Sequence, residues 1–103
     1  MGGSVQVRGV SRVPAGRFVE LPSRGRTFVR EHPGPHGAPT VVLLHGWTAT
    51  AALNWRPSFG PLSDHFRVLA LDHRGHGRGL RAADPFRLED CADDVAALLR
   101  SVW

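Results

Sequence analysis

Short apolar runs separated by Gly- and Pro-rich segments predict the strands of this chain. Residues 17–21 and 26–30 are rich in strand-forming side chains and flank Pro22-Ser23-Arg24-Gly25, a sequence typical of turns. These two runs predict an antiparallel hairpin. Residues 5–10 also alternate apolar and polar positions, but Gly9 interrupts the pattern, and we expect residues 1–16 to be poorly ordered.

Two later runs are continuously apolar. Thr40–Leu44 and Arg67–Leu71 lack alternation, which is typical of strands covered on both faces in a parallel sheet. Between them, Pro57, Gly60 and Pro61 argue against one long helix and favour a short helix over residues 61–66.

The last third of the chain carries one helical stripe. Apolar residues recur at spacings of three and four over residues 88–102, as Leu88, Cys91, Ala92, Val95, Leu98, Leu99 and Val102. Acidic side chains, Glu89, Asp90, Asp93 and Asp94, fill the first turns, and Arg100 lies in the last turn, which suits the helix dipole. Strands alternating with helices predict an α/β fold in which parallel strands are joined by right-handed crossover helices. We expect residues 1–103 to belong to a single domain.

Composition and charge exclude several classes of protein. The chain has 42% hydrophobic residues and no apolar run long enough to span a membrane, and no secretory signal is recognisable. Its 13 basic residues are all Arg and give a net charge of +4. They form no aromatic-interleaved stripe, so we expect no nucleic-acid partner, although the Arg-rich first 30 residues leave that alternative open. The single cysteine, Cys91, fits a cytoplasmic location and a buried structural thiol.

Two motifs follow the two continuous strands. The first strand ends in His45-Gly46-Trp47, and the second ends in Asp72-His73-Arg74-Gly75-His76-Gly77-Arg78-Gly79. This ordered pair resembles the α/β-hydrolase superfamily, in which one strand ends in His-Gly-X and the next in Asp-X-Arg-Gly-X-Gly-X-Ser or Gly. The resemblance covers roughly residues 17–103.

The resemblance implies roles for these residues. The backbone N–H of Trp47 is expected to be one oxyanion-hole donor, since the family takes its second donor from this loop. His45 is expected to support the loop, and Gly46 to leave room for the chain to turn and for a small-molecule substrate. Asp72 and Arg74 are expected to tie neighbouring loops together around the tight turn at Gly75 and Gly77. The alternative is that His45-Gly46-Trp47 is only a strand-ending turn.

The family's catalytic residues are not found here. No Ser among the 103 residues has Gly two positions before and two after it, so there is no nucleophile elbow. The resemblance places the nucleophile strand, the acid and the catalytic His beyond Trp103. We therefore expect a partial α/β-hydrolase fold, truncated before the nucleophile strand. Ester, lactone or amide hydrolysis is the activity of the full-length family, and the chain is expected to be inactive alone.

The missing strand leaves an expected open edge. In the family's strand order, residues 41–44 pair with residues 68–71 on one side and with the nucleophile strand on the other. An exposed apolar edge favours self-association or pairing with a complementing chain. A non-catalytic interaction module and one half of a split hydrolase therefore stay open as alternatives.

No cofactor or metal is expected. Residues 75–79 contain no Gly-x-Gly-x-x-Gly that opens a helix, so they are not a dinucleotide fingerprint. His73 and His76 stand three residues apart, but no third and fourth ligand lies at suitable spacing.

Overall fold

A computed structural model describes residues 13–102. Its elements in chain order are β1 (Gly16–Leu21), β2 (Gly25–His32), β3 (Thr40–Leu44), α2 (Ala51–Ser63), β4 (Arg67–Leu71) and α3 (Leu88–Val102). The expected disorder of residues 1–16 and the weak strand pattern at residues 5–10 fall largely or wholly outside the described residues. Gly16 already belongs to β1.

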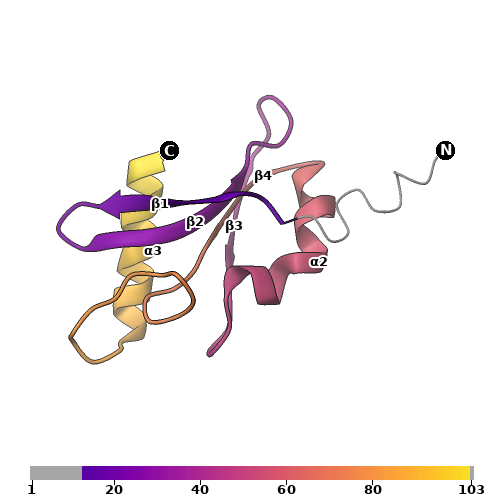
Figure 1. Ribbon diagram of the computed structural model, residues 1–103. Helices are drawn as coiled ribbons and strands as arrows, with labels where there is room; N and C mark the ends of the chain where they lie inside the picture. Colours follow the sequence, from indigo (N-terminus) through magenta and orange to yellow (C-terminus); the bar gives the residue numbers. More distant parts are fainter. Residues whose placement is uncertain (1–12, 103) are drawn as a thin grey trace.

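The four strands form one mixed sheet in the order β1-β2-β4-β3 (Figure 1). β1 and β2 form the predicted antiparallel hairpin, and β2 continues antiparallel to β4. β3 and β4 are parallel, and their last residues, Leu44 and Leu71, are register partners. The α/β class, the hairpin and the parallel pair are therefore confirmed.

Helices α2 and α3 cover opposite faces of the sheet (Figure 1). Leu69 and Leu71 of β4 pack in one cluster with Ala97 and Leu98 of α3. The alternate residues of β4, Val68 and Ala70, join a second cluster with Phe59 of α2. Because side chains alternate across a strand, β4 is buried on both faces, as its continuous apolar run predicts.

The prediction that α2 is interrupted was wrong. One helix runs over Ala51–Ser63 with Pro57 and Pro61 inside it. Because Pro has no backbone N–H, Pro57 cannot donate to the Leu53 carbonyl and Pro61 cannot donate to the Pro57 carbonyl. Leu53, Pro57 and Pro61 all face solvent, so water can satisfy the carbonyls left without a helical donor. Phe59 on the opposite face anchors the helix to the sheet.

β3 is less covered than its apolar run predicts. Only Leu43 is fully buried, and Leu44 keeps 46% of its surface exposed. Helix α3 has the predicted bounds, but Leu88 and Ala92 of its apolar stripe are exposed. Both departures arise because α3 packs over β1, β2 and β4 rather than over the carboxyl end of β3.

Candidate functional site

Both sequence motifs lie at one edge of the sheet. β3 and β4 run in the same direction and end together at Leu44 and Leu71, so residues 45–47 and residues 72–79 leave adjacent strand ends. The carboxyl edge of parallel strands is where α/β folds place their ligand sites. The fold therefore brings the two motifs together at this edge.

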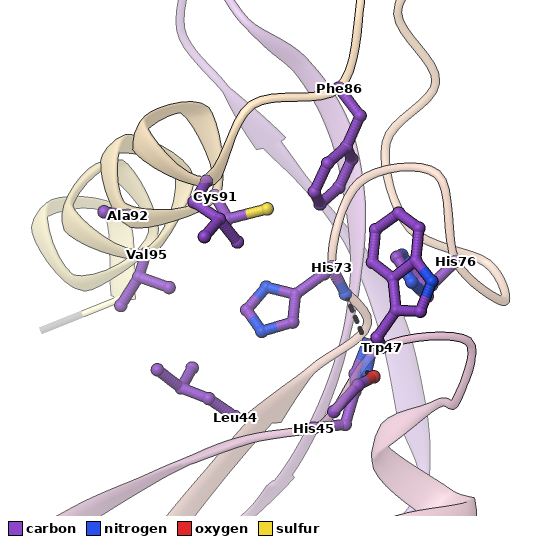
Figure 2. A pocket seen from close by; sticks show the side chains of 11 residues that line it. Leu44, His45, Trp47, His73, His76, Phe86, Cys91, Ala92 and Val95 are labelled. Carbon is purple, nitrogen blue, oxygen red and sulfur yellow. Dashed lines mark hydrogen bonds between the residues drawn. The ribbon is translucent and has the colours of Figure 1, made fainter.

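The His45 ring joins the two loops. It is buried, and its Nε2 accepts the backbone N–H of His73 at 2.8 Å. Its Nδ1 lies 2.7 Å from the carbonyl oxygen of Gly46. An N–H only donates and a carbonyl only accepts, so both contacts require the neutral ring with its proton on Nδ1. His45 thereby fixes the loop after β3 to the loop after β4 (Figure 2).

The loop after β3 has an unusual backbone at Thr48. The left-handed conformation in this loop belongs to Thr48, with φ 61°, and Gly46 has no positive φ. A β-branched residue seldom adopts this region, and strain of this kind concentrates at functional sites. The side chain of Trp47 is 67% exposed, and the Trp47 N–H bonds to no acceptor within residues 13–102.

Asp72 connects the loop after β4 to the start of α2. Its Oδ1 accepts the backbone N–H of Ala51 at 2.9 Å, and its Oδ2 accepts the N–H of Arg78 at 3.1 Å. Gly77 is needed beside it, because a Cβ there would lie 2.5 Å from Asp72 Oδ2 and its φ is +47°. Gly75 also has a positive φ, 77°. The Gly-rich turn thus folds back over the Asp72 carboxylate.

Arg74 pairs with Asp94 of α3. Its Nε and Nη2 donate to Oδ2 and Oδ1 of Asp94 at 2.7 and 2.9 Å. The position of Asp94 in the first turns of α3 predicts a dipole-matching acid, whereas Asp94 is buried and also accepts from Arg24 Nε at 2.7 Å. Burial alone would raise the pKa of Asp94, but the bonds from Arg74 and Arg24 lower it overall. The acidic residues beside Asp94 in the sequence obscure this role. The one sequence signal for it is the position of Asp94 on the buried face of the helix, three residues after Cys91 and four before Leu98.

An aromatic cluster covers the same edge. The rings of His45 and His73 are 4.6 Å apart, and Trp47 lies 4.9 Å from Phe86 and 5.2 Å from His76. Burial lowers the pKa of His73, and the nearby His45 and His76 lower it further. Its Nδ1 is buried with no hydrogen-bond partner in the described structure. Within residues 13–102, no three His, Cys, Asp or Glu side chains form a metal-binding group.

An apolar cavity of about 290 Å³ opens beside this cluster (Figure 2). It lies between the two loops and the first turns of α3, and it is lined by Leu44, His45, Gly46, Trp47, His73, His76, Phe86, Leu88, Cys91, Ala92 and Val95. Burial raises the pKa of the Cys91 thiol, which disfavours the thiolate that a nucleophile needs. The buried position of Cys91 agrees with the sequence prediction.

The family follows from the comparison with known proteins. Residues 39–102, more than half of the chain, match the model of the α/β-hydrolase fold family. The chain belongs to this family. The matched residues contain both motifs and both helices, so the α/β-hydrolase assignment covers the whole candidate site.

Relatives of this α/β-hydrolase chain are hydrolases. It is 38% identical over 81 residues to the proline iminopeptidase PfmaB of Pestalotiopsis fici, covering 76% of this chain and 27% of that protein. It is 39% identical over 67 residues to the bifunctional esterase/perhydrolase DCH of Acinetobacter calcoaceticus, covering 64% and 24%. Among solved structures, E-2-(acetamidomethylene)succinate hydrolase superposes with a TM-score of 0.75 at 33% identity, covering 85% of this chain and 31% of that one.

The chain spans about a quarter of the length of these curated relatives. Within residues 13–102, neither helix combines the length and apolarity needed to cross a bilayer. The shared segment holds the two loops described above, and the 103 residues contain no Gly-x-Ser-x-Gly.

Proposed function

We propose that this chain supplies the oxyanion-hole loop of a hydrolase that cleaves an ester, lactone, amide or related bond in a small-molecule substrate. The backbone N–H of Trp47 is the donor. The observation that carries this proposal is an N–H at the carboxyl edge of the sheet that bonds to no acceptor in residues 13–102, within a loop held by His45. The hydrolase relatives support the reaction class.

The chemistry follows from charge. Attack of a nucleophile on a carbonyl places a negative charge on the carbonyl oxygen, and a preorganised N–H stabilises that charge without having to reorient. In this fold a second donor comes from the residue after the nucleophile. Both the nucleophile and that donor must come from residues other than these 103, so the chain is proposed to be inactive alone.

A first experiment measures the isolated chain. Purified residues 1–103 are mixed with a p-nitrophenyl ester, and release of nitrophenolate is expected to match the buffer rate. Trp47→Pro serves as the comparison because Pro removes the backbone N–H. Turnover well above background that disappears in Trp47→Pro would contradict inactivity of the chain.

A second experiment tests the donor itself. Residues 16–102 replace the matching segment of E-2-(acetamidomethylene)succinate hydrolase, which aligns with 85% of this chain. Trp47→Pro in this chimaera is expected to lower kcat about 10²–10³-fold, and Trp47→Phe, which keeps the N–H, is expected to change it little. Equal loss in both variants would assign the effect to the side chain and reject the backbone donor.

A second function is favoured by the open side of β3. No strand within residues 13–102 pairs with its outer edge, and Leu44, Trp47 and Leu88 remain exposed beside the apolar cavity. We propose that this surface pairs with a second copy of the chain or with a complementing chain that supplies the nucleophile strand. Sedimentation of the purified chain tests this, and a stable monomer that unfolds cooperatively would count against self-association.

A cytoplasmic location is also proposed, and its basis is that the chain has a single cysteine.

A further inference from the structure

The two peptide groups on either side of Gly46 are each held by a side chain, one by Asn54 and the other by His45. The Gly46 N–H donates to Oδ1 of Asn54 at 2.5 Å, while the Gly46 carbonyl lies 2.7 Å from Nδ1 of His45. No peptide bond in the described residues is cis, so the N–H of Trp47 points opposite to the Gly46 carbonyl within one rigid plane. Fixing that carbonyl therefore fixes the direction of the Trp47 N–H.

Asn54 is itself held in place at the start of α2. The helix begins at the N-cap Thr50, whose side chain accepts the N–H of Leu53 at 3.2 Å, and the Asn54 N–H donates to the Thr50 carbonyl at 3.1 Å. The Ala51 N–H is bound by the buried Asp72. The first turn of α2 is thus anchored to the loop after β4, and it presents the Asn54 carboxamide to the loop after β3.

The hydrogen bond between the Gly46 N–H and Asn54 is not a consequence of burial. Asn54 is exposed, so water could satisfy its carboxamide, yet the oxygen accepts a loop amide. The loop also needs restraint, since Thr48 two residues later holds a left-handed backbone. A Cβ at Gly46 would lie 3.4 Å from Asn54 Oδ1, so the approach is close but does not by itself demand glycine.

We propose that Asn54 is a positioning residue: its carboxamide oxygen holds the Gly46 N–H so that the His45-bonded Gly46–Trp47 peptide keeps the Trp47 N–H turned toward the reacting carbonyl. The catalytic consequence rests on the proposed function, but the clamp on the loop does not. The role of Asn54 could not be predicted from the sequence, because a single exposed Asn in a helix carries no motif.

The clamp is tested first without any activity, in the ¹⁵N-labelled 103-residue chain. Asn54→Leu removes the acceptor at similar volume, Asn54→Asp keeps an acceptor oxygen, and Arg56→Ala is the control on an exposed position of the same helix. Asn54→Leu is expected to speed exchange of the Gly46 amide at least tenfold and to broaden the ¹⁵N signal of the His45 Nδ1–H. Asn54→Asp and Arg56→Ala are expected to match the parent chain.

Exchange at the buried Leu69 amide separates a local effect from unfolding. If Gly46 exchange is unchanged in Asn54→Leu, or if Leu69 exchange accelerates by the same factor, the positioning role is overturned. Asn54→Ser, whose side chain is too short to reach, is the second variant should Asn54→Leu fold poorly.

The chimaera supplies the activity readout. Asn54→Leu is expected to lower kcat about tenfold with little change in KM, and Asn54→Asp to restore most of the loss. A loss confined to KM would overturn the positioning role. If Trp47→Pro leaves kcat intact there, the proposed function fails while the exchange data still decide whether the clamp exists.

Discussion

Asp94 and Arg74 lie 20 residues apart in the sequence and form a two-bond ion pair, with Nε to Oδ2 at 2.7 Å and Nη2 to Oδ1 at 2.9 Å. The Arg74 side chain is 10% exposed and that of Asp94 is 3% exposed. Arg24 from the β1–β2 turn also pairs with Asp94, and Asp90 lies 3.9 Å from both guanidinium groups. This network joins the hairpin, the loop after β4 and α3. It therefore holds the Gly-rich loop of the candidate site against the rest of the fold.

Replacing Asp94 should therefore be costly. Asp94→Asn removes the buried charge that the two guanidinium groups share and leaves them only Asp90, at 3.9 Å from each. Removing one member of a buried pair typically costs about 3–5 kcal/mol, and the contacts to Asp90 place the expected cost at the lower end of that range. We expect the free energy of unfolding, measured with urea, to fall by that order. Asp93→Asn, on the exposed side of the same helix, is the matched control. Equal stability of the two variants would show that the network stabilises little.

Acid should destabilise the chain in two separate ranges. Because burial lowers the pKa of His73, with help from His45 and His76, the unfolded chain takes up this proton more readily than the folded one. Stability is expected to decline as the pH falls below about 6.5, the ordinary pKa of His. Glu31 of β2 accepts from Arg17 and Arg67 at 2.8 and 2.9 Å, and although burial opposes it, these bonds lower the pKa of Glu31. The pKa values of Asp94 and Glu31 are both lowered, so their contributions are present at higher pH and are lost as the pH falls below about 4.

His73→Leu separates these two ranges. Thermal unfolding measured between pH 7.5 and 4.5 should show a flatter pH dependence in this variant, while the loss below about pH 4 persists. His36→Leu, in the exposed loop before β3, is the control and should keep the parent slope. An unchanged slope in His73→Leu would remove His73 as the source.

Thr48→Gly tests the strained turn. Glycine adopts φ 61° without the steric cost that a β-branched residue bears, which exceeds the extra entropy that glycine loses on folding. We expect the free energy of unfolding of Thr48→Gly, measured by chemical denaturation, to be about 0.5–1 kcal/mol higher than that of the parent chain. Ala49 has no positive φ, so Ala49→Gly relieves no strain and should instead lower the free energy of unfolding. A Thr48→Gly chain less stable than its parent would contradict strain at this position.

Pro57→Ala tests the account of α2. Alanine restores an N–H that can donate to the Leu53 carbonyl and removes the clash of the Pro ring, so the helix should gain about 1–2 kcal/mol. Circular dichroism during heating measures the gain. Pro35→Ala, in the loop before β3, offers no helical bond to restore and should be neutral or slightly destabilising. Loss of stability in Pro57→Ala would mean that the Pro ring itself packs favourably.

Much of the fold was readable from local pattern. The strands at residues 17–21, 26–30, 40–44 and 67–71 and the helix at residues 88–102 were predicted because periodicity and turn residues depend on near neighbours along the chain. The positions of His45-Gly46-Trp47 and of Asp72 at strand ends followed from the same local signals. Those signals also placed both motifs at one edge, since parallel strands share their carboxyl end.

Tertiary structure decided the rest. Asp94 became a buried acceptor because Arg24, 70 residues away, and Arg74 converge on it, which no local pattern records. The helix α2 tolerates Pro57 because that face meets water, and a sequence does not show which face meets water until the packing is known. The same holds for Asn54, which bonds to Gly46 from the start of α2, where Asp72 binds the Ala51 N–H. The sequence alone determined the strands, the last helix and the motifs; long-range contacts determined which side chains hold the motifs in place.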